Sequence, residues 1–161
     1  MNGFLLAESR RAIVTPLDRP AVVTALRELA PKTHNVRIFR STFEGDIWPD
    51  RISIGYRCGW FVPPIRLVTF SGVLRQTDGG TTIDGPIRAA WVFYVLGVWL
   101  ATAFPFAIYH YVTSGDAGGA ISSLVAVVLL FFLGRAFLRS TQDYVVREIA
   151  RAVRGRIESR K

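Results

Sequence analysis

The sequence predicts an α+β membrane protein in which a small antiparallel β-sheet is followed by a two-helix transmembrane hairpin and an amphipathic helix. Three observations predict this class. Two uncharged apolar runs, Ala89–Val112 and Ala117–Leu133, lie in the second half of the 161-residue chain. Several short stretches between residues 35 and 87 alternate between apolar and polar side chains, as half-buried strands do. Helical apolar spacing occurs before these stretches and again after the second apolar run.

The N-terminal residues predict a strand followed by a helix. Ser9–Thr15 favour a short strand. Asp18 or Arg19 is expected to cap a helix with Pro20 in its first turn, where the missing N–H costs little. Pro31 is expected to end this helix. The apolar side chains recur at helical spacing and predict one buried face: Val22, Val23, Leu26 and Leu29.

The central residues predict the rest of the sheet. Residues 35–43 and 51–57 have the period of two that strands require, residues 65–74 are another strand candidate, and residues 81–87 are the returning strand. Gly45-Asp46 and Trp48-Pro49-Asp50 are typical of turns. Thr77–Gly80 predicts a hairpin turn, because glycine supplies the positive φ that such turns require. We expect four or five antiparallel strands, with the first and last helices covering one face.

The two apolar runs predict a membrane hairpin. A helix needs about 20 apolar residues to cross the hydrocarbon core, with about 17 as the lower limit. The four-residue link Thr113–Asp116 is long enough only to reverse direction. Arginines flank the two runs on the side of the chain termini, whereas the link contains no Lys or Arg. Because Lys and Arg near spans mark the cytoplasmic face, both termini are expected to be cytoplasmic, at the bacterial inner membrane.

The C-terminal residues predict a separate helix. Ser140 and Asp143 resemble a capping box, with Asp in place of Glu. Apolar residues then recur every three or four positions as far as Ile157, with arginines between them. This basic amphipathic helix is expected either to pack on the β-domain or to lie along the membrane surface. We therefore expect a cytoplasmic α+β domain over residues 1–88, the hairpin over 89–138 and the amphipathic helix over 139–161.

The charge distribution predicts a lipid partner. The net charge is +8, and all of the positive charge lies on the side of the termini. Basic residues near anionic headgroups stabilise binding by about 1 kcal/mol each, so nucleic acid is not required to explain the charge. The residues expected to contact anionic headgroups are Arg88, Arg135, Arg139, Arg147, Arg151 and Arg154. The N-terminus lacks the pattern of a signal peptide, and the single Cys58 fits a reducing cytosol.

The hairpin also predicts a surface for docking. Gly97 with Ala101, and Gly119 with Ser123, form small-xxx-small pairs that allow helices to approach closely. These pairs pack the two spans on each other or dock onto the helices of another protein. The aromatic residues expected to face lipid or a partner include Trp91, Trp99, Phe131 and Phe132. In the loop after Cys58, Trp60 and Phe61 either enter the headgroup region, bind a partner or tuck over the sheet.

The sequence gives little support to catalysis, transport or a cofactor. His110 lies between two tyrosines near the outer end of the first span. It is interpreted as an interfacial residue of an aromatic belt, with ligation of a haem or chlorophyll-type pigment as the alternative. No phosphate loop, metal-ligand cluster or nucleophile motif is present. Glu44, Asp46 and Asp50 are interpreted as turn carboxylates, and the spans lack the ionisable groups typical of transporters.

Residues 35–135 resemble a loose group of uncharacterised bacterial inner-membrane proteins. The motifs that carry the resemblance are Phe43-Glu44-Gly45, Ile52-Ser53-Ile54, Phe70-Ser71-Gly72 and the return strand Gly80-Thr81-Thr82-Ile83-Asp84-Gly85, followed by Arg88 and the spans. The resemblance implies a β-meander running into two spans and no known activity. The expected function is a non-enzymatic accessory subunit of a respiratory, photosynthetic or transport complex, with other integral membrane proteins as partners. A membrane-tethered module that binds a lipid or small ligand is the alternative.

Overall fold

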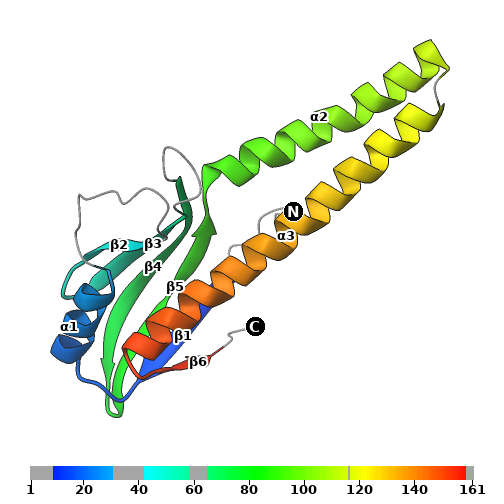
Figure 1. Ribbon diagram of the computed structural model, residues 1–161. Helices are drawn as coiled ribbons and strands as arrows, with labels where there is room; N and C mark the ends of the chain where they lie inside the picture. The colour runs from blue at the N-terminus through cyan, green and yellow to red at the C-terminus, as the bar shows by residue number, and fades with distance from the viewer. Residues whose placement is uncertain (1–8, 31–41, 59–64, 116, 159–161) are drawn as a thin grey trace. The chain divides into compact units, whose positions relative to one another are not determined.

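The computed structural model describes residues 9–30, 42–58, 65–115 and 117–158. The chain forms two compact units, one made of residues 1–90 with 141–161 and the other of residues 91–140. The elements, in chain order, are β1 (Ser9–Thr15), α1 (Arg19–Leu29), β2 (Thr42–Ile47), β3 (Arg51–Cys58), β4 (Ile65–Thr77), β5 (Gly80–Ala89), α2 (Trp91–Ser114), α3 (Ala117–Ala152) and β6 (Arg156–Glu158) (Figure 1).

The first unit contains a six-stranded sheet in which every pairing is antiparallel. Its strand order is β2-β3-β4-β5-β1-β6, so β2 to β5 form a meander and β1 returns to pair with β5. Ile13 of β1 lies opposite Ile83 of β5 on one side and Ile157 of β6 on the other. The predicted α+β class with an antiparallel sheet is confirmed, with six strands in place of four or five.

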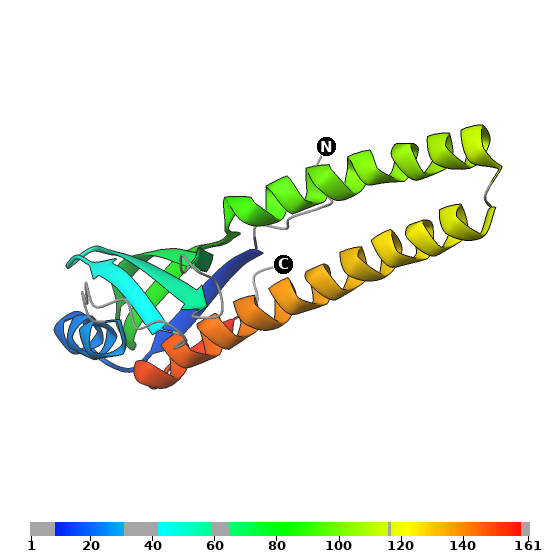
Figure 2. The ribbon, with the colours of Figure 1, turned by 45° about the horizontal axis from the view of Figure 1, so that its top comes forward.

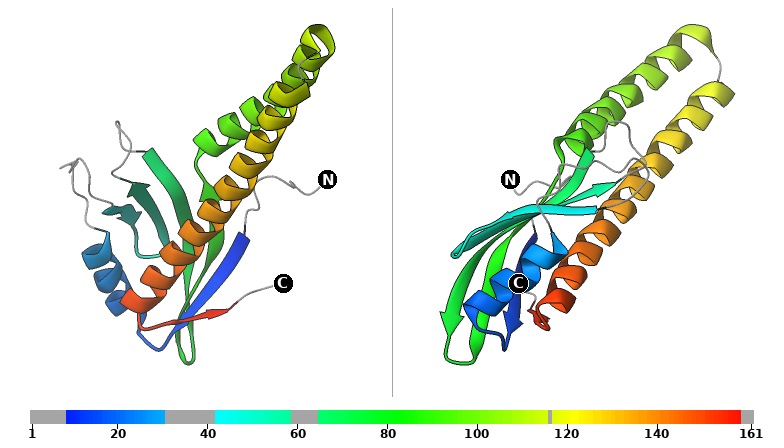
Figure 3. Two further views of the ribbon diagram at one scale, coloured as in Figure 1. Left: turned by 45° about the vertical axis from the view of Figure 1, so that its right-hand side comes forward. Right: turned by 60° about the vertical axis from the view of Figure 1, so that its left-hand side comes forward.

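One face of the sheet forms the core because its strands alternate with a period of two. Ile52, Ile54, Phe70, Ile83 and Ile87 are completely or almost completely buried on this face. The apolar stripe of α1 and the last turns of α3, which belong to the same unit, lie along that face (Figures 2 and 3). Burying each large apolar side chain contributes roughly 1.5–3 kcal/mol, which makes this face the main source of stability.

The predicted first helix is confirmed together with its cap. The Asp18 carboxylate accepts a hydrogen bond from the Ala21 N–H at 3.2 Å, and Pro20 lies in the first turn. Val22 and Leu26 are fully buried. The helix ends at Leu29, and Pro31 lies outside the described residues.

The hairpin between β4 and β5 is confirmed as well. Thr77 pairs with Gly80 across a two-residue turn. Gly80 has a φ of +133°, and a Cβ there would lie 2.1 Å from the Thr15 carbonyl oxygen. Glycine is therefore required at Gly80 both by its backbone conformation and by the close approach of β1.

Three sequence predictions about element boundaries are wrong. Gly45 and Asp46 lie inside β2, where a turn was predicted. Ser140 does not begin a helix, because α3 runs without a break from Ala117 to Ala152. The last helix stops at Ala152 and does not reach Ile157, which lies in β6. Of the strand predicted over residues 35–43, residues 35–41 lie outside the described part of the chain, as does the loop 59–64.

Candidate membrane anchor and its charged boundary

The N-terminal half of α3 is a long apolar surface that the chain itself leaves largely exposed. Residues 117–134 carry no charge. The large side chains Val128, Leu129, Leu130, Phe132 and Leu133 are 44–65% exposed. Successive residues of an α-helix are about 100° apart, so these five positions cover a sector of about 200°, more than half of its circumference. A helix that is apolar on all sides is stable when lipid or other protein covers it.

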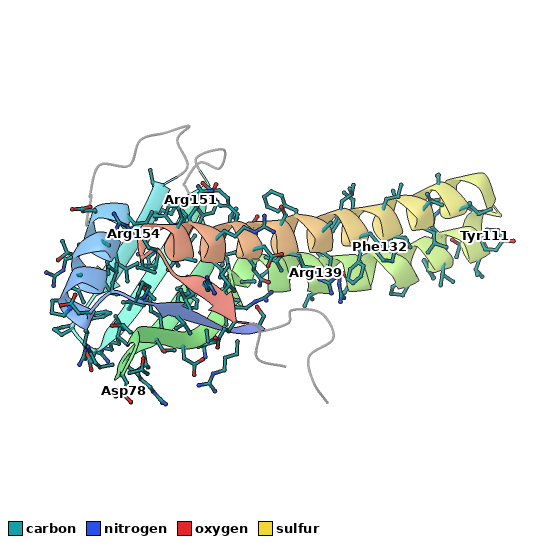
Figure 4. All side chains as sticks on the ribbon, turned by 90° about the horizontal axis from the view of Figure 1, so that it is seen from below. Asp78, Tyr111, Phe132, Arg139, Arg151 and Arg154 are labelled. Atoms are coloured by element: carbon teal, nitrogen blue, oxygen red, sulfur yellow. The ribbon has the colours of Figure 1, made fainter. Side chains whose placement is uncertain are left out.

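The described residues contain one helix that is long and apolar enough to cross a membrane, over Ile121–Ala152. Figure 4 labels Phe132 within its apolar part. The second helix of this unit, α2, runs in the opposite direction to α3 (Figures 1 and 2). Its large apolar side chains whose surroundings are described, such as Val98, Trp99 and Phe106, are also exposed.

Two arginines follow the apolar part of α3. Arg135 lies two residues after Leu133, and Arg139 follows one helical turn later. Arg139 is exposed and makes no ion pair within the described residues (Figure 4). The apolar surface therefore ends at a basic pair.

The last turns of α3 pack on the sheet of the first unit. Val145 and Ile149 are fully buried. Arg147, Arg151 and Arg154 are exposed, and Arg151 lies 2.5 Å from the Glu148 carboxylate. Arg147 and Arg151 therefore lie on the exposed side of α3, whose other side contacts the β-domain, and Arg154 lies in the turn after the helix.

An aromatic cluster attaches this part of α3 to the sheet. The ring of Tyr144 lies 6.1 Å from that of Phe43 and 5.5 Å from that of Tyr56, measured between centroids. The nearby Arg11 guanidinium lies 3.2 Å from the Asp143 carboxylate. Burial raises the pKa of Tyr144, and the negative charge of Glu148 and the neighbouring Tyr56 raise it further. Sequence reasoning missed this cluster, although the alternation in β2 and β3 places Phe43 and Tyr56 on one face.

The opposite face of the sheet is polar and carries its own ion pairs. The Glu44 carboxylate lies between two guanidinium groups, at 2.5 Å from Arg57 and 3.0 Å from Arg66. Arg10 donates two hydrogen bonds to the buried carboxylate of Asp84, at 3.1 and 2.9 Å. The interpretation of Glu44 and Asp46 as turn carboxylates is wrong, since both lie in β2 and Glu44 joins three strands. Asp50 lies in the bend before β3, as predicted.

The predicted docking residues are only partly described. A Cβ placed on Gly97 would meet no atom within 4 Å, and Trp99 is exposed. The Ser123 hydroxyl donates to the Gly119 carbonyl at 2.8 Å, so it is satisfied within α3. Phe131 and Phe132 make an edge-to-face contact with each other. The side chains of Trp91 and Ala101, and residues Trp60 and Phe61 altogether, lie outside the described residues.

His110 lies near the C-terminal end of α2. It is exposed, and its Nδ1 is 3.2 Å from the Ser114 hydroxyl. Among the described residues, no group of three or more His, Cys, Asp or Glu side chains is placed to hold a metal ion. The choice between an interfacial role and pigment ligation for His110 stays a prediction.

Comparison of the chain with protein family models, with curated proteins and with solved structures gives no match. The resemblance to bacterial inner-membrane proteins therefore stays a prediction. The fold and the exposed apolar helix define the class on structural grounds, as an α+β protein whose described residues include one helix long and apolar enough to cross a membrane.

Proposed function

We propose that the chain is a membrane-anchored accessory subunit in which α2 and α3 both span the bilayer and the β-domain lies on the cytoplasmic side. The observation that carries this proposal is the exposure of large apolar side chains over more than half of the circumference of α3 between Val125 and Leu133. Soluble proteins rarely expose a continuous apolar surface of this size. The uncharged length of α2, from Trp91 to Ser114, supports a second span.

The orientation of the proposed hairpin follows from its flanking charges. Arg88 precedes α2 and Arg135 follows the apolar part of α3, whereas the link around Gly115 contains no Lys or Arg. Positive charge next to a span favours the cytoplasmic side. Both chain termini and the β-domain are then cytoplasmic, and the link is outside.

This orientation is tested by labelling single cysteines in intact cells. In a Cys58→Ser background, Ser114→Cys places a thiol next to the link and Asp78→Cys places one at the exposed β4–β5 turn. A membrane-impermeant maleimide is expected to label position 114 in intact cells, and position 78 only after permeabilisation. Labelling of both positions, or of position 78 alone, in intact cells would contradict the orientation.

A docking role is supported by the uncovered surface of α2. The space around Gly97 is open, and the neighbouring Val98 and Trp99 are exposed. Small residues on a membrane helix let a second helix approach its backbone closely. We therefore infer that α2 packs through Gly97 against a helix of another integral membrane protein.

Gly97→Leu is expected to release that partner, because the larger side chain separates the two backbones. Val98→Leu, one residue away at an exposed position, is expected to retain it. The measurement is the mass of the tagged chain purified from its native membrane in mild detergent, with the stoichiometry of the co-purifying protein. A monodisperse 17.9 kDa monomer from the unaltered chain would contradict the accessory role.

The alternative role, binding of a lipid or small ligand by the β-domain, receives less support from the packing. The core face is occupied by the chain's own side chains, since Phe70, Ile83 and Ile87 of the sheet and Val145 and Ile149 of α3 are all fully buried. A non-enzymatic role is supported by the carboxylates of Glu44, Asp84 and Asp143, which are held in ion pairs.

A further inference from the structure

We propose that Arg135 and Arg139 form a binding site for the headgroup of an anionic phospholipid. This inference rests on the proposed function, because it requires the apolar part of α3 to lie in a bilayer. It goes further by naming two residues and one class of lipid. Charge complementarity favours this partner, since a basic pair, the half-buried Arg135 and the exposed Arg139, ends an uncharged surface of 18 residues, 117–134.

The spacing of the two arginines suits one headgroup. Residues four apart on an α-helix lie on the same side, one turn above the other. A rise of 1.5 Å per residue places Arg135 about 3 Å and Arg139 about 9 Å beyond Leu133 along the helix. The headgroup layer extends about 5–8 Å beyond the hydrocarbon core. Side chains on a helix lean back toward its N-terminus, which is toward Leu133, so both guanidinium groups reach the phosphates.

The chemistry of the pair favours a phosphate. A guanidinium group presents several donors in a plane and binds phosphate oxygens in a bidentate manner. Arg139 makes no ion pair within the described residues, so its charge is available to a ligand. A lipid with a net negative headgroup is attracted to both positive charges, whereas the ammonium of a zwitterionic headgroup opposes this attraction.

The more distal arginines do not belong to this site. Arg147 follows Leu133 by fourteen residues, which corresponds to about 21 Å of α-helix and exceeds the depth of the headgroup layer. Arg151 is already paired with Glu148. Arg147 therefore serves as a control, together with Arg75, which is exposed at the far end of β4.

The test measures lipid selectivity at the protein surface. The full chain is reconstituted in phosphatidylcholine vesicles, and the immobilised fractions of spin-labelled phosphatidylglycerol and spin-labelled phosphatidylcholine are compared by electron spin resonance. The unaltered chain is expected to prefer phosphatidylglycerol by about fivefold or more, the effect of one arginine near an anionic headgroup. Arg135→Gln/Arg139→Gln is expected to reduce the preference to less than about twofold.

Two matched variants separate this site from general charge. Arg75→Gln/Arg147→Gln removes the same charge and is expected to keep the preference. Arg135→Lys/Arg139→Lys keeps the charge and is expected to retain most of the preference for phosphatidylglycerol. Equal preferences for the Arg135→Gln/Arg139→Gln variant and its control, or no preference in the unaltered chain, would overturn the proposal.

Membrane incorporation is measured separately by flotation of the same vesicles at alkaline pH. A chain that floats without a lipid preference contradicts the phospholipid site and leaves the membrane anchor standing. A chain that does not float contradicts the anchor and the phospholipid site together.

Discussion

Replacing Val125 and Leu129 together with arginine is expected to release the chain from membranes. Both side chains are about half exposed in the apolar part of α3, where we propose that lipid surrounds them. An arginine at the centre of a membrane helix costs roughly 2.5–3.5 kcal/mol, so the pair costs about 5–7 kcal/mol. The measurement is the fraction of the chain that remains with membranes after alkaline carbonate extraction.

The matched control places arginine at two similarly exposed apolar positions of the β-domain. Val73 is 48% exposed on β4 and Ile157 is 40% exposed on β6. If water surrounds these side chains, Val73→Arg/Ile157→Arg leaves extraction unchanged. Equal extraction of the two double variants would show that the apolar surface of α3 is not in lipid.

Gly85→Ala is expected to destabilise the β-domain by about 3 kcal/mol, the upper part of the range for overpacking. A Cβ at Gly85 would lie 1.9 Å from the Ser71 carbonyl oxygen and 2.6 Å from the Gly72 Cα. Both atoms belong to the backbone of the neighbouring strand β4, so a side-chain rotation does not relieve the contact. The measurement is the free energy of unfolding of the full chain in detergent, from the far-ultraviolet signal of the sheet in urea.

Gly79→Ala provides the control in the same hairpin. A Cβ at Gly79 meets no atom within 4 Å, and its φ is not positive. Such a substitution leaves stability unchanged or raises it by about 0.4–1 kcal/mol, because alanine restricts the unfolded chain. A Gly85→Ala variant as stable as Gly79→Ala would contradict the close strand contact at Gly85.

Sequence patterns predicted the structure correctly where the interactions that produce it lie within one helix or strand. The cap at Asp18 and the proline at position 20 belong to the helix that they start, and the alternation in residues 51–57 belongs to one strand. The turn predicted at Gly45 is wrong because glycine occurs both in turns and at places where two strands approach closely. In β2 it allows close approach, since a Cβ there would lie 2.5 Å from the Ser53 carbonyl oxygen.

The pattern at Ser140 and Asp143 failed for a different reason. A capping box requires a non-helical residue at its first position. The apolar helix continues through Ser140, and Asp143 pairs with Arg11, which is 132 residues away in the sequence. The apolar periodicity beyond Ser140 therefore belongs to α3 and does not mark a new helix.

The candidate anchor could be identified from the sequence, whereas the point at which α3 leaves the proposed membrane and packs on the sheet could not. The uncharged stretch 117–134 and the arginines after it require only composition to identify. The choice of Arg135 and Arg139 over Arg147, Arg151 and Arg154 requires knowing where α3 begins to pack on the sheet. The burial of Val145 and Ile149 supplies that information.

The sequence by itself determined the α+β class, the apolar helix and the asymmetry of charge, because hydropathy, periodicity and charge are properties of short segments. Only the tertiary structure decided that β1 pairs with β5 and β6, that Glu44 joins Arg57 and Arg66, and that Tyr144 packs on the sheet. These contacts join residues from different elements. Their partners are chosen by packing and charge compensation across the folded chain, which no local pattern records.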